Sequence, residues 1–259
     1  MLQSLRAPGC AAAALMLVLS ACSGSGSDTN SSAPATQTPS PAPTSTTPTS
    51  ATTPTAVPPS TPAAKPARTA AQLTKALLAL KDLPPGFSIE TDNSDDDSDV
   101  VLSSKDPRCA RLVALANADT PPGSKASAAQ SYSGGAQGPF IDESLDAMGS
   151  AAAVAALQRS FKQAIANCRT MTLKIPGQGS SPISVRQVSA PQAGTDPVAV
   201  RFTATAGPLE GLEVTMITTG IDDVVLATTV VAGLPEDIDG ATTTAVDKAK
   251  STLSAQPGA

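Results

Sequence analysis

Residues 211–230 read GLEVTMITTGIDDVVLATTV, two apolar runs on either side of GIDD, residues 220–223. In the first run Leu212, Val214 and Met216 occupy alternate positions, and the second run is rich in β-branched residues. Alternation with period two is typical of a strand with one buried face, and GIDD is a turn signal. The stretch therefore predicts two antiparallel strands joined by a tight turn.

The same pattern extends upstream. Val198, Val200 and Phe202 alternate with polar or small residues, GPLEG (207–211) reads as a turn, and Ile183 and Val185 alternate before that. Further upstream, KASAAQSYSGG (125–135) and GPFIDESLDAM (138–148) predict two more strands around a glycine-rich turn. Residues 87–90 are expected to be extended.

Four helices are predicted around these strands. Residues 69–80 begin with Thr69 and Gln72 at capping-box spacing, and LPPG (83–86) ends this segment. A second helix should follow Asp106-Pro107, which suits a helix start. A third follows Ser150, with one apolar stripe: Val154, Leu157, Phe161, Ile165 and Cys168. A fourth covers about 238–253.

Strands grouped together with helices at both ends predict an α+β fold. We expect a single domain over residues 69–255, with an antiparallel sheet of about five to six strands and the helices packed on one face. Nearly 190 residues suffice for one hydrophobic core.

The N-terminus has the features of an export signal. Arg6 precedes a short apolar run that ends in Leu19-Ser20-Ala21-Cys22, too short for a transmembrane helix of about 20 residues. Residues 1–21 therefore predict a signal peptide. The end of the run resembles a bacterial lipobox, which implies that Cys22 is diacylated, palmitate included, and anchors the chain to the cell membrane. The alternative is a soluble secreted protein in which Cys22 is incidental.

Residues 22–68 are dominated by Ser, Thr, Pro, Ala and Gly. Such a composition cannot bury enough apolar surface to offset the entropy of ordering, so we expect a disordered linker. Threonine–proline tracts often carry O-linked sugars, and the composition leaves glycosylation open.

Two cysteines, Cys109 and Cys168, remain in the predicted domain. Outside the membrane the environment is oxidising, so we expect a structural disulfide between them. A redox-active pair is disfavoured because the chain has no Cys-x-x-Cys spacing.

The chain has no histidine and a net charge of −5. Histidine-based catalysis and histidine metal sites are therefore excluded, and no phosphate or dinucleotide loop is present. We expect no enzyme, no cofactor and no nucleic-acid partner. A hydrolase using a Ser–Lys pair, for instance at Ser131 or Ser160, or a carboxylate pair stays open.

Two loops have site-like composition. TDNSDDDSDV (91–100) spaces Asp95, Asp97 and Asp99 like a calcium loop, but Val100 stands where glycine is needed. We interpret it as a solvated loop and predict no metal site. The stretch SYSGGAQGPF (131–140) could form a hairpin turn with two core aromatics, or it could line the mouth of a ligand site. The residues of such a ligand mouth would be Tyr132, Gly134, Gly135 and Phe140.

Taken in order, LPPGF, the segment bearing Cys109, SYSGG, the helix SAAAVAALQRSFKQAIANC (150–168), the strands of 211–230 and a closing helix form a set of landmarks. This layout resembles the extracellular sensor-like domain of mycobacterial PknH-type receptor kinases and of actinobacterial lipoproteins. The resemblance implies an α+β domain with a ligand cleft. Members of that family carry two disulfides and some tryptophan, whereas this chain has one cysteine pair in the domain and no tryptophan.

These observations predict a non-catalytic lipoprotein with a sensor-like domain, anchored on the membrane and facing the periplasm or cell wall. Its partners would be the membrane and an unidentified small molecule, lipid or envelope protein. Two alternatives remain: an envelope scaffold that works through a partner protein, and a PsbP-like lipid- or glycolipid-binding lipoprotein.

Overall fold

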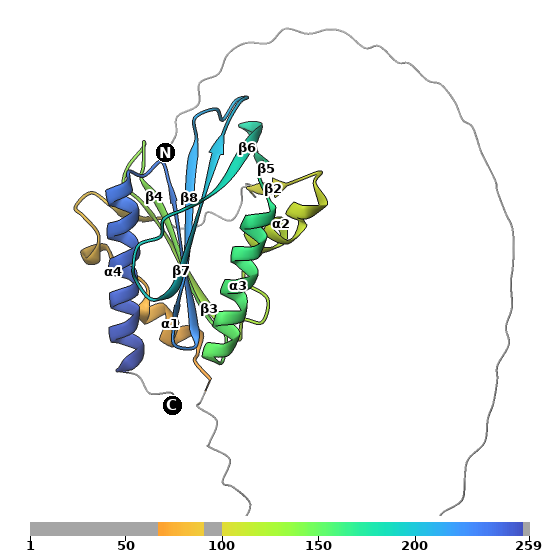
Figure 1. The fold of residues 1–259 in the computed structure, drawn as a ribbon. Helices are drawn as coiled ribbons and strands as arrows, with labels where there is room; N and C mark the ends of the chain where they lie inside the picture. Colours follow the sequence, from red (N-terminus) through yellow and green to blue (C-terminus); the bar gives the residue numbers. More distant parts are fainter. Residues whose placement is uncertain (1–66, 91–99, 256–259) are drawn as a thin grey trace, which may run out of the picture. The chain divides into compact units, whose positions relative to one another are not determined.

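A computed structural model describes residues 67–90 and 100–255. The predicted signal peptide, Cys22 and all but the last two residues of the predicted linker lie outside these residues. So do residues 91–99 of the acidic stretch. The described residues belong to one compact unit, built around a single large sheet (Figure 1).

The sheet has nine strands in the order β1-β3-β4-β9-β8-β7-β6-β5-β2, and every neighbouring pair is antiparallel. Its strands, in chain order, are β1 (Ser88–Glu90), β2 (Val101–Ser103), β3 (Ala126–Ser133), β4 (Phe140–Ala147), β5 (Thr170–Ile175), β6 (Gly179–Val188), β7 (Thr195–Ala204), β8 (Glu213–Ile221) and β9 (Val224–Val231). The predicted pair within 211–230 is confirmed as β8 and β9, with Ile221 opposite Val224.

The expected number of five to six strands was wrong. Strand β2 has only three residues and lacks a regular apolar alternation, and β1 is equally short and exposed. Strand β5 follows the third helix so closely that Thr170 comes three residues after its end. The edge strands β1 and β2 pair with β3 and β5, which are distant from them in sequence, so local pattern gave little sign of these pairings.

The helices are α1 (Ala70–Ala76), α2 (Ala110–Ala116), α3 (Ala151–Asn167) and α4 (Pro235–Ser254), with short 3-10 turns η1 (Leu80–Asp82) and η2 (Pro107–Cys109). We expected the helices to pack on one face of the sheet, but they are divided between its two faces. Helices α1 and α4 cover one face, and α2 and α3 cover the other (Figure 1).

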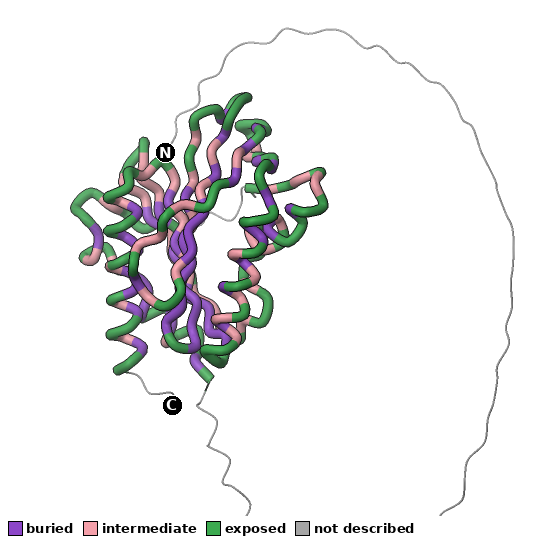
Figure 2. Tube along the Cα trace, viewed as in Figure 1, coloured by how far each residue is buried: buried purple, intermediate pink, exposed green. Residues whose placement is uncertain are grey.

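The reason is that the central strands are apolar on both sides. On β7, Ala199 packs in the core beneath α1 and α4, whereas its neighbours Val198 and Val200 pack in the core beneath α3. Successive side chains on a strand point to opposite faces, so each face requires its own cover. Figure 2 shows the resulting buried band along the central strands, between the two helical layers.

Helix α1 begins as predicted, with the Thr69 hydroxyl accepting from Gln72 N–H and the Gln72 side chain accepting from Thr69 N–H. It ends at Ala76, earlier than the periodicity indicated. Beyond that point the Leu78 N–H donates to Glu143 and the Leu78 carbonyl accepts from the Tyr132 hydroxyl. These tertiary hydrogen bonds satisfy backbone groups that a longer helix would have used.

A helix cap and a disulfide stabilise the layer formed by α2 and α3. Helix α3 is capped by Ser150, and Cys168 at its C-terminal end is disulfide-bonded to Cys109, as predicted. Arg68 is buried, so the folded part includes the residue before the predicted start at Thr69. Within residues 67–90 and 100–255, no helix has both the length and the apolarity needed to span a membrane.

Candidate functional site

A groove crosses the sheet on the face that carries α2 and α3. It consists of two cavities, of about 240 and 300 Å³, that share Ala116, Met216 and Thr229 and therefore adjoin. We call it the sheet-face groove. Its floor lies on strands β4 to β9, because α3 covers only part of this face.

The floor is largely apolar, and the part of it formed by β8 and the end of β9 is only half-buried. Val214, Met216 and Val231 are in this state, although equivalent residues elsewhere in the sheet are fully buried. Under the helices Phe161 forms one wall and the end of α2 forms the other. Half-buried apolar side chains lining a concavity are typical of small-molecule sites.

The wall provided by α2 is held by covalent and polar contacts. Cys109, directly before α2, is bonded to Cys168 at the end of α3. At the other end of α2, the Asn117 side chain accepts from Leu102 N–H and donates to the Leu102 carbonyl. The groove is therefore bounded by a short helix fixed at both ends.

Strand β4 brings carboxylates to both faces of the sheet. Asp142 and Asp146 belong to the sheet-face groove, whereas Glu143 lies on the opposite face beneath α1 and α4. All three residues lie in the strand predicted at 138–148, and the alternation of side chains along a strand separates them between its two faces.

Asp146 sits at one end of the groove and is almost fully buried. Its carboxylate accepts from the hydroxyls of Ser124 and Ser144. Burial raises the pKa of this carboxyl above its ordinary value, and the serine hydroxyls, which lower it, offset this only in part. The groove thus offers a polar group at one end of an apolar floor.

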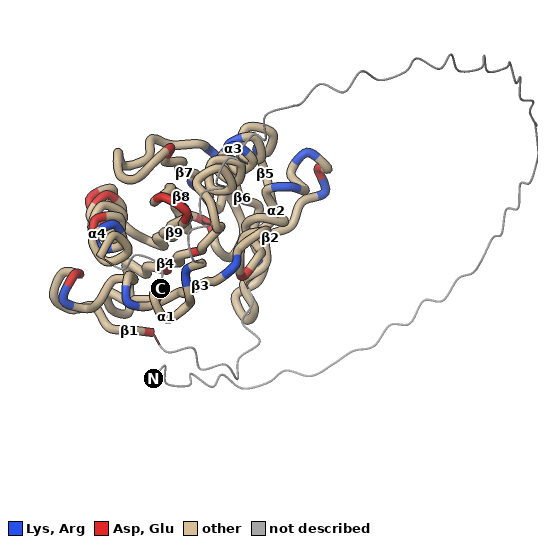
Figure 3. The backbone as a smooth tube through the Cα atoms, turned by 90° about the horizontal axis from the view of Figure 1, so that it is seen from below, with Lys and Arg blue, Asp and Glu red and all other residues tan. Residues whose placement is uncertain are grey.

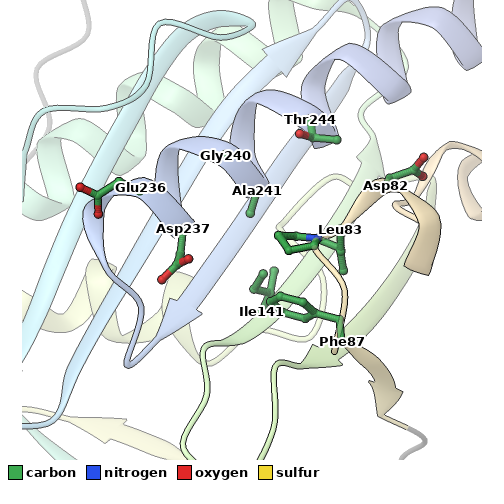
Figure 4. Close-up of a pocket in the computed structure, with 10 residues that line it drawn as sticks. Asp82, Leu83, Phe87, Ile141, Glu236, Asp237, Gly240, Ala241 and Thr244 are labelled. Carbon is green, nitrogen blue, oxygen red and sulfur yellow. The ribbon is translucent and has the colours of Figure 1, made fainter.

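Another cavity, of about 360 Å³, lies on the other face of the sheet, between α4, β4 and the segment after η1. We call it the α4 pocket (Figure 4). Leu83, Phe87 and Ile141 gather on one side, while Asp237, Gly240 and Thr244 line the side formed by α4.

Asp82 lines the α4 pocket, and a buried glutamate that does not line it, Glu143, lies near Asp82. Asp82 is ion-paired with Lys248 on α4, and Lys248 is the largest cause of its lowered pKa. Glu143 follows Ile141 on the same face of β4 and is buried. Desolvation raises the pKa of Glu143 to about 7, although the Leu78 N–H and Lys248 both act to lower it.

Glu143 Oε1 has no hydrogen-bond partner within the described part of the chain, and neither does the hydroxyl of Thr228. These two residues are directly opposite each other on β4 and β9. A neutral carboxyl has a proton to donate, and the Thr228 oxygen lies on the adjacent strand. With a pKa of about 7, the neutral form of Glu143 predominates below neutral pH, and this neutral form avoids the cost of a buried charge.

The proposed ligand mouth at 131–140 forms the turn between β3 and β4. Tyr132 is fully buried and its hydroxyl donates to the Leu78 carbonyl, whereas Gly135 is exposed and Phe140 is half-buried. Burial, with Glu143 and Asp82 as smaller causes, raises the pKa of Tyr132 well above its ordinary value. None of the four residues, Gly134 included, lines the groove or the α4 pocket, so the mouth stays a prediction.

In the part of the chain that the structure describes, neither Ser131 nor Ser160, the serines considered for Ser–Lys hydrolase chemistry, is hydrogen-bonded to a lysine. The Ser160 hydroxyl accepts from Arg111 Nε at 3.0 Å, and Ser131 is a strand residue opposite Glu90 and Asp142. Among the described residues no cluster of three or more Cys, Asp or Glu is arranged to hold a metal ion. The residues that sequence reasoning missed are those of the groove floor, such as Met216 and Thr229.

Comparison with solved structures gives the extracellular domain of PknH from Mycobacterium tuberculosis, with a TM-score of 0.50 and 15% identity over 73% of this chain and 98% of that one. The two domains share a fold. The domain also aligns with a Mycobacterium smegmatis ortholog of Rv0999, at a TM-score of 0.37 and 13% identity over 71% of this chain and 95% of that one. Neither protein-family models nor curated protein sequences give a match.

The shared fold confirms the resemblance to PknH-type extracellular domains that the landmarks indicated. At 15% identity this is a statement about fold.

Proposed function

We propose that this protein is a non-catalytic, membrane-anchored lipoprotein whose sensor-like domain, displayed outside the cytoplasm, binds an apolar small molecule or lipid in the sheet-face groove. The observation that carries the proposal is the half-buried apolar floor shared by two adjoining cavities. The fold shared with the extracellular domain of PknH supports an extracytoplasmic setting.

The chemistry of the groove favours a ligand with an apolar body and one polar end. Met216, Val214 and Val231 would contact the body, and burying their remaining exposed surface would stabilise the complex by about 25 cal/mol for each Å². Asp146, Ser144 and Thr229 supply hydrogen-bonding groups beside this apolar floor. An acyl chain with a hydroxylated end fits this arrangement.

Anchoring and binding can be tested together by native mass spectrometry of the full chain purified from its host membrane. We expect a mass increase on Cys22 that corresponds to diacylation, one disulfide, and a non-covalent apolar adduct. In parallel, we expect the Cys22→Ser variant in the soluble fraction after sedimentation, and not in the membrane pellet. If that variant sediments with membranes as the wild type does, the proposed anchor is wrong.

The alternative, an envelope scaffold, predicts a different result. Crosslinking in cells would then capture one partner protein at a fixed ratio, and the native mass spectrum would contain no small-molecule adduct. Such a partner would pair at edge strand β2, where Val101, its first residue, and Val100, directly before it, are exposed.

A further inference from the structure

The α4 pocket has a feature that neither the fold nor the sheet-face groove accounts for. Gly240 lies in the interior of a 20-residue helix, where glycine costs about 1 kcal/mol relative to alanine. Its backbone is not in the left-handed region, and no atom lies within 4 Å of the position that a Cβ would occupy. Neither backbone conformation nor close packing requires glycine here.

Gly240 does line the pocket, next to Ala241. A longer side chain at position 240 would occupy open space on the α4 side of the pocket, since Gly240 is one of its lining residues and no atom lies near its Cβ position. The effect of the glycine is therefore to keep the pocket open, at some cost to the helix. A cavity of about 360 Å³ falls in the usual range of small-molecule sites.

The walls of the pocket define what it would accept. Leu83, Phe87 and Ile141 provide an apolar surface, and the first turn of α4 carries Glu236 and Asp237 at the rim. Figure 4 shows Asp237 extending from the helix toward the space beside Ile141. The red band on α4 in Figure 3 shows that this end of the helix is predominantly acidic.

The balance of charge around the pocket is negative. Three carboxylates line it, those of Asp82, Glu236 and Asp237, and the Lys248 ammonium is engaged by Asp82. Asp237 also accepts from the Leu234 N–H, while Glu236 is exposed and has no ion pair among the described residues. The N-terminus of α4 offsets part of this negative charge, but a cation at the rim would still meet the Glu236 carboxylate, which has no ion pair among the described residues.

We propose that the α4 pocket binds a small cationic amphiphile, with its apolar body against Leu83, Phe87 and Ile141 and its ammonium group beside Glu236 and Asp237. This site is separate from the sheet-face groove, because the two lie on opposite faces of the sheet. Its test is therefore independent of the proposed function.

The test uses three probes of matched shape: phenylbutylammonium, phenylbutanol and phenylbutanoate. Binding to the full chain purified from its host is measured by saturation-transfer NMR, which detects weak ligands, against a matched blank without protein, because amphiphiles also partition into any lipid present. We expect the ammonium compound to bind tightest, the alcohol several-fold more weakly, and the carboxylate not at all. Glu236→Gln should weaken binding of the ammonium compound by about two- to five-fold and leave binding of the alcohol unchanged.

Gly240→Leu supplies the steric test, since leucine is a better helix former than glycine and the variant should fold. It should reduce binding at least tenfold. The matched control is Thr243→Leu, which places the same side chain on the exposed side of α4 and does not line the pocket. Equal binding of the three probes, no binding of the ammonium compound, or undiminished binding to Gly240→Leu would overturn the proposal.

Discussion

The Arg68 guanidinium Nε donates to the Asp223 carboxylate at 2.8 Å, although 155 positions separate the two residues. Arg68 also donates to the carbonyl of Leu253 near the end of α4. The point where the chain enters the domain, the turn between β8 and β9, and the end of the last helix are therefore joined by one buried side chain.

Removing one partner of this buried pair should be strongly destabilising. Arg68→Ala leaves the Asp223 carboxylate without its partner at a site with little access to water, and we expect a loss of about 3–5 kcal/mol in the free energy of unfolding. Urea denaturation monitored by circular dichroism measures it. Arg108→Ala, which breaks the exposed pair with Asp106, is the control and should change stability by less than about 1 kcal/mol.

Because the pKa of Glu143 is raised, we expect this residue to make the domain more stable in mild acid than at neutral pH. Because the folded-state pKa of about 7 exceeds the ordinary value of 4.5, the folded state holds the proton more strongly than the unfolded state. The stabilisation is complete below the ordinary pKa and is lost as pH rises toward about 7. At about 1.4 kcal/mol per pH unit, the loss is about 3 kcal/mol.

Urea denaturation of wild type and Glu143→Gln between pH 4 and pH 8 tests this. The difference between the two isolates Glu143, since the raised pKa of Asp146 acts in the same direction in both proteins and the lowered pKa of Asp82 acts in the opposite direction in both. The glutamine oxygen can still accept from the Leu78 N–H. Parallel stability curves for the two proteins would contradict a titrating Glu143.

The disulfide should stabilise both the domain and the groove. Cys109 and Cys168 are 59 positions apart, and closing a loop of that length is worth about 4 kcal/mol in the chain-entropy model. We expect the double variant Cys109→Ser with Cys168→Ser to lose about that amount. Hydrogen exchange should also increase most in α2, which the bond holds against α3. Exchange that rises equally throughout the sheet would show that the bond does not specifically fix this wall.

Ala116 is shared by both cavities of the sheet-face groove, so filling its position tests the proposed ligand site. Ala116→Phe should abolish the apolar adduct in native mass spectra while leaving the melting temperature within a few degrees. Ala114→Phe adds the same ring on the exposed side of α2 and serves as the control. An adduct that persists in Ala116→Phe would place the ligand elsewhere.

Much of the domain follows from local pattern. The capping box at Thr69, the Ser150 cap, the alternation in β7 and β8 and the turn between β8 and β9 depend on residues close together in sequence. The pairing of Cys109 with Cys168 also followed, since no other cysteine remains in the domain.

The sites did not follow in the same way. The ligand mouth at 131–140 stays a prediction, and only the tertiary structure shows that the Tyr132 hydroxyl donates to the Leu78 carbonyl. The position of a cavity depends on which strands the helices leave uncovered. The residue pattern of a single strand does not indicate this.

By itself, therefore, the sequence determined the helices, most of the strands, their antiparallel type and the one cysteine pair, because each depends on neighbouring residues or on elimination. Only the tertiary structure decided the number of edge strands, the division of helices between two faces, and the places where apolar floor remains open. Those features arise from contacts such as Arg68 with Asp223, between residues that local periodicity cannot relate.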